Sequence, residues 1–279
     1  MNVLVTGGCG QLGRALVRRA DTHGHAVTAV DIDKLDICDP AQVDAYVTRS
    51  EAVINAAAYT AVDKAEAEPE RAFAVNRDGA GVLARACAEH RRRLLHVSTD
   101  YVFDGAGTRP YREDDPIAPI GVYGASKAAG DALVHAAGGT VVRTSWLFGQ
   151  GGPSFVHTIV RLAKERPALR VVADQHGRPT WTDHLADALY RLLAVRDLAP
   201  TYHYASEGAT TWHGFATAIV EVARTKIALA CERIDAITTA GYPTAARRPA
   251  YSILDTERIA GLGIAMPPWR LGLEELIAR

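Results

Sequence analysis

The chain has 279 residues, of which 48% are hydrophobic and 23% charged, a composition typical of a folded globular protein rather than a disordered one. Its 31 Lys and Arg residues almost balance its 32 Asp and Glu residues, so the formal charge is −1. Such a chain has no overall field to hold nucleic acid or an anionic membrane. No apolar run approaches the roughly 20 residues that cross a bilayer.

The N-terminal residues and the cysteines both indicate the cytoplasm. Residues 1–5 lack the basic stretch and long apolar core of a secretory signal. The four cysteines form no CxxC pair and no cluster with histidine at zinc-like spacing, so reduced thiols are expected. We therefore expect a cytoplasmic protein that binds neither nucleic acid nor membrane.

Short apolar runs alternate with helical patterns through the first half of the chain. The runs of strand length are Asn2–Thr6, Ala26–Val30, Ala52–Asn55, Leu94–Ser98 and Thr140–Arg143. Helices are expected after the first run and over residues 70–90 and 123–137. Because such strands need crossover helices to return to one sheet, they pair in parallel, with both faces covered. The pattern predicts an α/β fold with a Rossmann-type doubly wound parallel sheet, whose ligands lie beyond the strand carboxyl ends.

The pattern loosens after about residue 146. Helices are expected over residues 155–165, 182–194, 211–226 and 270–278, with short strands at Leu169–Val172 and Tyr202–Ala205. We expect a dinucleotide-binding Rossmann domain over residues 1–150. Residues 151–279 are expected to form mainly a smaller C-terminal α/β lobe that binds substrate, although some of its segments can return to the first domain.

A glycine-rich turn follows the first expected strand, in the run Gly7-Gly8-Cys9-Gly10-Gln11-Leu12-Gly13, where a helix begins. Two spacings fit, GxxGxxG from Gly7 and GxGxxG from Gly8. Glycine permits the tight turn and lets backbone N–H groups approach a pyrophosphate, which the helix N-terminus also attracts. The strand–turn–helix context favours dinucleotide binding over a glycine turn without a ligand.

Acidic residues near the end of the second expected strand bear on the choice of cofactor. Asp31 follows that strand, where a carboxylate accepts hydrogen bonds from an adenosine ribose and favours NADH. Lys34 could offset part of its repulsion of a 2′-phosphate, so NADPH stays open. Asp36 and Ile37 form an acidic–apolar pair that lies either against the adenine or in a surface loop.

Tyr123 and Lys127 form a YxxxK motif at the start of an expected helix, where a spacing of four puts both side chains on one face. A nearby cation lowers the pKa of a phenol from its usual value of about 10, so Tyr123 is expected to exchange a proton near neutral pH. Thr99 follows the strand Leu94–Ser98 and offers a hydroxyl at the same sheet edge; alternatively it bonds a turn. Together these groups can polarise a ketone and protonate its oxygen while a dihydronicotinamide delivers hydride.

These motifs, with five longer segments, resemble the extended short-chain dehydrogenase/reductases and, within them, the dTDP-4-dehydrorhamnose reductase branch. The segments are Asn55–Glu66, Ser98–Phe103, Arg143–Trp146, Thr210–His213 and Tyr242–Pro249. The resemblance covers nearly the whole chain. It implies an oxidoreductase of nucleotide-sugar biosynthesis that reduces the C4 ketone of a dTDP-4-dehydro-6-deoxysugar, from dTDP-4-dehydro-β-L-rhamnose to dTDP-L-rhamnose, with NADPH or NADH.

The resemblance also implies roles for individual residues, with Tyr123 as proton donor, Lys127 on the nicotinamide ribose and Thr99 at the carbonyl. The residues assigned to the cofactor are Gly7, Gly10, Gln11, Leu12, Gly13, Asp31, Asp36, Ile37, Ala58, Tyr59, Thr60, Tyr123 and Lys127. Those assigned to the substrate are Thr99, Asp100, Trp146, Arg247 and Arg248. Trp146 would pack on the sugar, and the two arginines either contact its diphosphate or form structural salt bridges.

Three alternatives stay open. Sugar dehydratases resemble Thr-Asp-Glu where this chain has Thr99-Asp100-Tyr101, which argues for reduction over dehydration or epimerisation. A 4-ketosugar reductase of an antibiotic or streptose pathway would look much the same. The non-catalytic regulatory subunit of methionine adenosyltransferase also resembles this family. Some members use Mg²⁺ at a dimer contact, so a homodimer with Mg²⁺ stays open, and Asp183 is the one ligand we can suggest.

Overall fold

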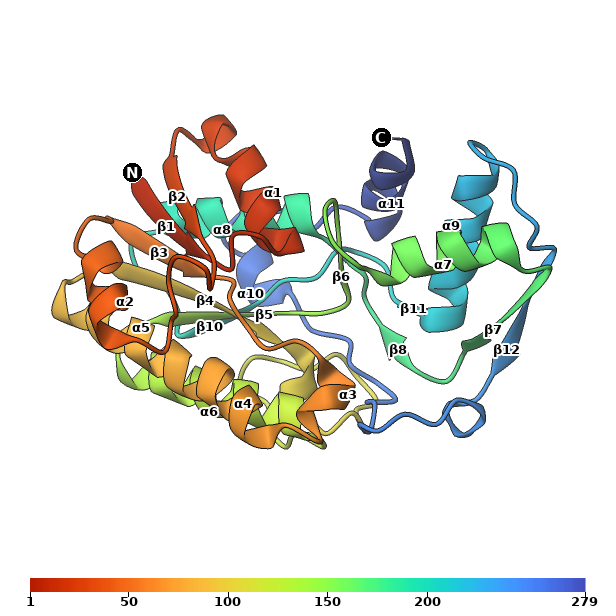
Figure 1. Cartoon of the computed structure of the whole chain (residues 1–279), viewed down its shortest axis with the longest axis horizontal. Coiled ribbons are helices and arrows are strands. Elements are labelled where there is room, and N and C mark those ends of the chain that lie inside the picture. Colours follow the sequence, from red (N-terminus) through yellow and green to blue (C-terminus); the bar gives the residue numbers. More distant parts are fainter. Residues whose placement is uncertain (279) are drawn as a thin grey trace.

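The computed structural model describes residues 1–278 and has a six-stranded sheet at its centre, in the order β10-β5-β4-β3-β1-β2 (Figure 1). Every neighbouring pair in this sheet is parallel. The strands are β1 (Asn2–Thr6), β2 (Ala26–Val30), β3 (Ala52–Asn55), β4 (Arg93–Thr99), β5 (Thr140–Thr144) and β10 (Thr201–His203). The order reverses between β1 and β3, which is where a doubly wound sheet opens a crevice for ligands.

Helices cover both faces of this sheet, and every residue of β3 and β5 is accordingly buried. One face packs against α1 (Gln11–Arg19) and α8 (Thr182–Ala194). The other packs against α2 (Pro40–Val47), α5 (Ala80–Glu89) and α6 (Val122–Ala136), as Figure 1 shows. The predicted doubly wound α/β fold is therefore confirmed.

The helix expected over residues 70–90 is divided into α4 (Pro69–Phe73), a π-helical turn at Ala74–Gly79 and α5. Asn76, buried in that π-helical turn, donates hydrogen bonds to the carbonyl of Tyr59 and the hydroxyl of Ser126. The π-helical turn therefore fixes the segment after β3 against α6. The sequence does not reveal this turn, because the helical repeat of apolar residues continues through it.

A second lobe has its own core and contains α7 (Phe155–Glu165), α9 (Trp212–Arg224), α11 (Trp269–Ala278) and the parallel pair β7 (Ala168–Val172) and β12 (Arg233–Ile237). Its shorter elements are β6 (Leu147–Phe148), β8 (His176–Gly177), β9 (Thr180–Trp181) and β11 (Thr210–Thr211). Two segments from this half of the chain lie with the first sheet instead: α8 packs against α1, and β10 extends the sheet beyond β5. Whether residues 1–150 and 151–279 act as separate domains stays a prediction.

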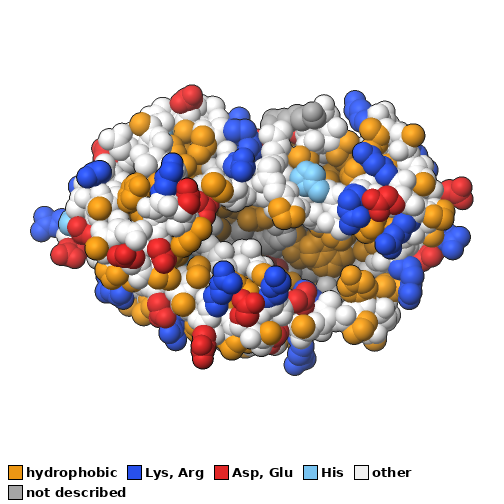
Figure 2. All heavy atoms as spheres, in the orientation of Figure 1, with side chains coloured by type: hydrophobic (Ala, Val, Ile, Leu, Met, Phe, Trp, Pro, Cys, Tyr) orange, Lys and Arg blue, Asp and Glu red, His pale blue; other side chains and the backbone are white. Residues whose placement is uncertain are grey.

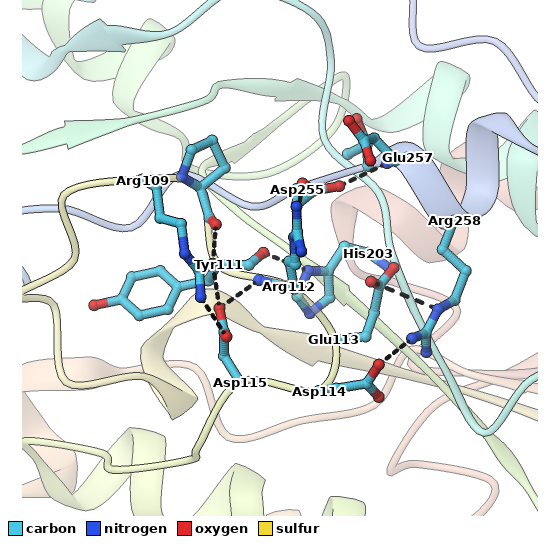
Figure 3. A network of polar contacts seen from close by, with 12 residues as sticks. Arg109, Tyr111, Arg112, Glu113, Asp114, Asp115, His203, Asp255, Glu257 and Arg258 are labelled. Carbon is cyan, nitrogen blue, oxygen red and sulfur yellow. Dashed lines mark hydrogen bonds and ion pairs between the residues drawn. The ribbon is translucent and has the colours of Figure 1, made fainter.

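An ionic network fastens the loop after β4 to the last strand of the sheet (Figure 3). Arg258, in the short helix α10 (Glu257–Ala260), contacts Asp114 at 2.6 Å and Glu113 at 3.7 Å. Glu113 in turn accepts a hydrogen bond of 3.1 Å from the backbone N–H of His203 in β10. The network therefore holds the loop after β4 and helix α10 against β10, the edge strand at the end of the sheet opposite β2.

Among residues 1–278, no helix is long and apolar enough to cross a membrane. The four cysteines Cys9, Cys38, Cys87 and Cys231 are free thiols, as the sequence predicts. Burial raises the pKa of the Cys87 thiol to about 12, so this side chain behaves as a small apolar group in the core between α5 and the sheet.

Candidate active site

A cavity of about 1080 Å³ lies along the carboxyl ends of β1, β3 and β4, where the fold places ligands. A hollow is visible near the centre of the face drawn in Figure 2, with hydrophobic side chains gathered in it. The predicted site residues that line the cavity are Gly7, Gly10, Gln11, Leu12, Gly13, Asp31, Asp36, Ile37, Ala58, Tyr59, Thr60, Thr99, Asp100, Tyr123, Lys127 and Trp146.

The glycine turn leaves no room for a side chain at Gly7 or Gly13. Gly7 has a left-handed φ of 73°, and a Cβ there would lie 2.7 Å from the backbone nitrogen of Ala57. A Cβ on Gly13 would overlap the carbonyl oxygen of Gly7, whereas one on Gly10 would meet only that oxygen, at 3.3 Å. No side chain within the described part of the chain caps the N-terminus of α1, so its first N–H groups face the cavity uncapped.

Asp31 holds the glycine turn in place. Its carboxylate accepts hydrogen bonds from the backbone N–H groups of Cys9 at 2.8 Å and Ile32 at 2.9 Å. Asp36 likewise accepts from the N–H of Cys38 at 2.9 Å, so its carboxylate shapes its own loop as well as lining the cavity. Lys34 is exposed.

The predicted catalytic groups meet at the end of β4 and the first two turns of α6. The hydroxyl of Thr99 lies 3.0 Å from a carboxylate oxygen of Asp100. Tyr123 packs its ring edge-on against Tyr101, with ring centroids 5.5 Å apart. Lys127 is 1% exposed and donates a hydrogen bond of 2.8 Å to the carbonyl of Val97.

The expected lowering of the pKa of Tyr123 by Lys127 is wrong for this structure. Burial raises the pKa of Tyr123 above its usual value; a hydrogen bond from Thr99 works against this, and the carboxylates of Asp100 and Asp131 add to it. Burial also lowers the pKa of Lys127 to about 8, with Asp131 opposing the change. The physical reason is that burial disfavours both the phenolate and the ammonium, a cost that residue spacing cannot reveal.

Asp100 is a buried carboxyl group inside the cavity. Burial raises its pKa to about 6, against the effect of hydrogen bonds from Ser252 and Thr99. Its second carboxylate oxygen has no hydrogen-bond partner among the residues that the structure describes. A buried carboxyl group with a raised pKa and an unpartnered oxygen is typical of functional sites.

Two tryptophans form one wall of the cavity. Trp146 and Trp212 are stacked, with ring centroids 3.6 Å apart and planes 9° from parallel. Trp146 has a left-handed φ of 46°, and Gly177 leaves the space that its indole occupies. Trp212 belongs to one of the segments that carry the family resemblance, but no motif in the sequence assigns it a role.

Other residues of the cavity have no role assigned from the sequence, although several lie within the segments that carry the family resemblance. They include Val62, Arg71, Val75, Ser98, Tyr101, Thr144, Ser145 and Leu147. Tyr101 could have been found, since it stands where the sugar dehydratases have glutamate and directly follows Asp100. The pKa of its phenol is raised, first by burial and then by Asp100.

Arg247 and Arg248 are not among the described residues that line the cavity. Arg248 forms a salt bridge of 2.7 Å with Asp63, so the structural alternative is the one present, while Arg247 is exposed. A magnesium site finds no support: residues 1–278 contain no group of three or more His, Cys, Asp or Glu side chains that could hold a metal ion. Asp183 is paired with Arg18 at 2.6 Å.

Comparison with known families settles the kinship of the chain. The sequence profile of the RmlD substrate binding domain matches residues 1–279. The chain belongs to this family. The family predicted from the motifs around Gly7, Thr99 and Tyr123 is thus confirmed.

Relatives within the RmlD family match along nearly their whole length. The dTDP-4-dehydrorhamnose reductase of Burkholderia thailandensis is 43% identical over 97% of this chain and 96% of its own. That of Streptomyces griseus is 44% identical over 98% of this chain and 91% of its own. The crystal structure of dTDP-4-dehydrorhamnose reductase from Bacillus anthracis in complex with NADP is 37% identical, with a TM-score of 0.93, covering 99% of this chain and 98% of that one.

The cavity of this RmlD-family chain fits a nicotinamide dinucleotide. The space beside Gly7 and Gly13 excludes a Cβ but leaves the backbone open, and the uncapped N-terminus of α1 offers N–H groups to a pyrophosphate. Asp31 directly follows β2, the place where an adenosine ribose binds in such folds, and Asp36 lies in the loop after it. A cofactor seated there would extend towards Tyr123 and Lys127, which line the same cavity.

Proposed function

We propose that this chain is an NAD(P)H-dependent oxidoreductase that reduces the C4 ketone of dTDP-4-dehydro-β-L-rhamnose to dTDP-L-rhamnose. The observation that carries the proposal is that Thr99, Tyr123 and Lys127 line one cavity with a dinucleotide-type glycine turn. The two curated relatives reported above are named for this reaction, and they match over nearly the full chain.

In the proposed mechanism Tyr123 is the proton donor. When bound, the dihydronicotinamide supplies hydride to C4 of the sugar. Thr99 donates a hydrogen bond to the ketone oxygen, and Tyr123 transfers its phenolic proton to that oxygen as the C–H bond forms. A developing alkoxide matches the raised pKa of Tyr123, because proton transfer to a strong base does not require an acidic phenol. Lys127 holds the nicotinamide ribose.

The remaining assigned residues bind rather than react. We propose that Gly7, Gly10, Gln11, Leu12 and Gly13 bind the pyrophosphate, and that Ala58, Tyr59 and Thr60 run beside the cofactor. Asp31, Asp36 and Ile37 hold the adenosine. Asp100 and Trp146 contact the sugar, with Trp212 behind Trp146 adding stacking area. Residues 151–279 supply most of the substrate lobe.

The choice between NADPH and NADH depends on Asp31. Two backbone N–H groups already bond its carboxylate, which partly offsets its charge towards a 2′-phosphate. The Bacillus anthracis relative was solved with NADP. We propose that the chain uses both dinucleotides, and that Asp31→Ala shifts the ratio of kcat/KM values in favour of NADPH.

The test is a steady-state assay with dTDP-4-dehydro-β-L-rhamnose and each dinucleotide, with the product identified by NMR. A reductase consumes one dinucleotide per sugar and is insensitive to a chelator if no metal takes part. A dehydratase or epimerase converts the sugar without net oxidation of dinucleotide, and a regulatory subunit converts nothing; either result overturns the proposal. Comparison with other dTDP-4-keto sugars identifies a reductase of an antibiotic or streptose pathway. Light scattering tests for a homodimer.

A further inference from the structure

A row of buried polar side chains lies directly behind Lys127. Thr6, Asn55 and His96 are aligned by the register of β1, β3 and β4, and each is 1% exposed. The hydroxyl of Thr6 lies 2.8 Å from Asn55 Oδ1, Asn55 Nδ2 lies 2.9 Å from His96 Nδ1, and His96 Nε2 lies 3.1 Å from Lys127 Nζ. The proposed mechanism uses Lys127 and leaves the rest of the row unexplained.

The orientation of the Asn55 amide follows from its backbone neighbour. The N–H of Ala57 points at Asn55 Oδ1 over 3.0 Å, and a backbone N–H is a donor in every state of the protein. The amide oxygen must therefore face Ala57, and Thr6 can donate to the same oxygen by rotating its hydroxyl. The amide nitrogen of Asn55 then donates to His96 Nδ1, which must be an unprotonated acceptor.

The tautomer of His96 follows in turn. Burial, with Lys127 beside it, holds the pKa of His96 well below its usual range, so the imidazole is neutral. With Nδ1 unprotonated, the proton of a neutral imidazole is on Nε2, and this N–H faces Lys127 Nζ. An ammonium has three donors and no acceptor, whereas a neutral amine has a lone pair that can receive the His96 N–H.

The surrounding charges leave this arrangement intact. The charged and titratable groups around the pair among the described residues are Asp131, His135 and Arg143. Tyr123 lies one turn before Lys127 on α6. Asp131, one turn beyond Lys127 on α6, favours the ammonium, but Arg143 pairs with one of its carboxylate oxygens at 3.3 Å. Its other oxygen lies 3.9 Å from His96 Nε2 and has no hydrogen-bond partner within residues 1–278, so the His96 N–H has a second acceptor within a small movement.

We infer that Asn55 fixes His96 as the Nε2–H tautomer and that this N–H favours the uncharged amine of Lys127 over its ammonium. Asn55 and His96 are positioning residues, since neither lines the cavity among the described residues.

The consequence for turnover rests on the proposed function. After Tyr123 has given its proton to the sugar oxygen, an N–H bond of the Lys127 ammonium breaks and the O–H bond of Tyr123 re-forms. The remaining amine of Lys127 accepts a hydrogen bond from the His96 N–H. Solvent returns one proton to Lys127 in each cycle.

Lysine NMR tests the inference without substrate or cofactor. The chain has five lysines, and Lys34, Lys64, Lys164 and Lys226 are exposed, so Lys127 stands apart in protein labelled with ¹³C at lysine Cε. In the unaltered protein Lys127 should titrate near pH 8, well below the other four. In His96→Gln the side-chain amide can turn its oxygen towards the ammonium, and the pKa of Lys127 should rise by about one unit.

A second variant acts on the tautomer itself. In Asn55→Asp a carboxylate of the same shape accepts a hydrogen bond from a proton on Nδ1, so the imidazole changes to the Nδ1–H tautomer. Its Nε2 lone pair then faces the ammonium, and the pKa of Lys127 should again rise. His203→Gln is the control, because it also removes a buried histidine but one that contacts Arg143 rather than Lys127. It should leave the titration of Lys127 in place even if the protein is less stable.

The inference fails if imidazole ¹⁵N shifts of the unaltered protein place the His96 proton on Nδ1, a measurement that needs no variant to fold. It also fails if Lys127 titrates alike in the parent, His96→Gln and Asn55→Asp. In assays with the sugar and NADPH, the fall of kcat at high pH should move up by about one pH unit in His96→Gln. Absence of turnover in the unaltered protein would reject the proposed function while leaving the NMR result to decide the tautomer.

Discussion

At the cofactor end of the cavity the close contacts are made by backbone, whereas at the catalytic end they are made by buried polar and charged side chains. A Cβ on Gly7 or Gly13 would meet backbone atoms, which carry no net charge. His96, Lys127 and Asp131 are each 1% exposed and have charge-dependent contacts with one another. Substitutions at the cofactor end should therefore act by changing the shape of the turn. Substitutions at the catalytic end should act by changing which side chains are protonated.

The largest effect should come from Tyr123→Phe. Loss of a general acid typically costs about 10²–10⁴-fold, so kcat/KM with the sugar and NADPH should fall by that factor while the fold is kept. Tyr101→Phe removes a neighbouring phenol from the same cavity and should lose much less. Steady-state kinetics and thermal melting of both variants make the comparison. Equal losses in the two variants would remove Tyr123 from its role as proton donor.

Gly13→Ala should break the cofactor end by shape alone. The added methyl group would overlap the carbonyl oxygen of Gly7, and relieving that overlap should cost about 2–3 kcal/mol of unfolding free energy. Gly10→Ala is the matched control, since its Cβ meets the same oxygen at 3.3 Å and should cost much less. Urea unfolding without ligands measures both. Similar losses would mean that the turn adjusts and that Gly13 is not needed for close approach.

Lys127→Met should stabilise the protein at neutral pH, because it removes a buried ammonium from the catalytic end. Burial lowers the pKa of Lys127 to about 8 in the folded protein, from 10.5 as the ordinary value. Between these values the unfolded chain binds more protons, so the stability of the parent protein should rise as the pH goes from 8 to 10.5. Below pH 8 both states are protonated and the full penalty applies, about 3 kcal/mol.

Lys127→Met should therefore be more stable than its parent at pH 7, and this advantage should be smaller at pH 10. The variant should be inactive at both pH values. Urea unfolding at the two pH values, with Lys164→Met as an exposed control, measures this. A parent protein whose stability does not change between pH 8 and 10 would show that Lys127 keeps its proton as easily folded as unfolded.

The same contrast explains what could be predicted from the sequence. The strands of the central sheet, α7, α8 and the glycine turn follow from local patterns. The residues assigned to the cofactor, some from these patterns and others from the YxxxK spacing or the family resemblance, all line the cavity. The alignment of Asn55 with His96 depends on strand register, and its meeting with Lys127 depends on how α6 lies on the sheet. Neither is encoded within one segment. For the same reason the sequence predicts a lowered pKa for Tyr123 from its spacing to Lys127, whereas burial raises it.

The smallest effect should come from Arg248, which belongs to neither end. Its salt bridge with Asp63, together with the bond from the N–H of Ala246 to that carboxylate, ties the loop at Tyr242–Pro249 to α3 (Val62–Ala65). The side chains are 18% and 47% exposed, so a double-mutant cycle of Arg248→Ala and Asp63→Asn should give a coupling below about 1 kcal/mol.

The KM for the sugar decides between the two roles that the sequence left open for Arg248. A guanidinium that binds the diphosphate would raise KM about tenfold or more when removed, and would do so whether or not Asp63 is present. A purely structural salt bridge changes KM little, and Asp63→Asn alone reproduces that small change. We expect the second pattern, because Arg248 lies outside the described lining of the cavity and its guanidinium already has a carboxylate partner.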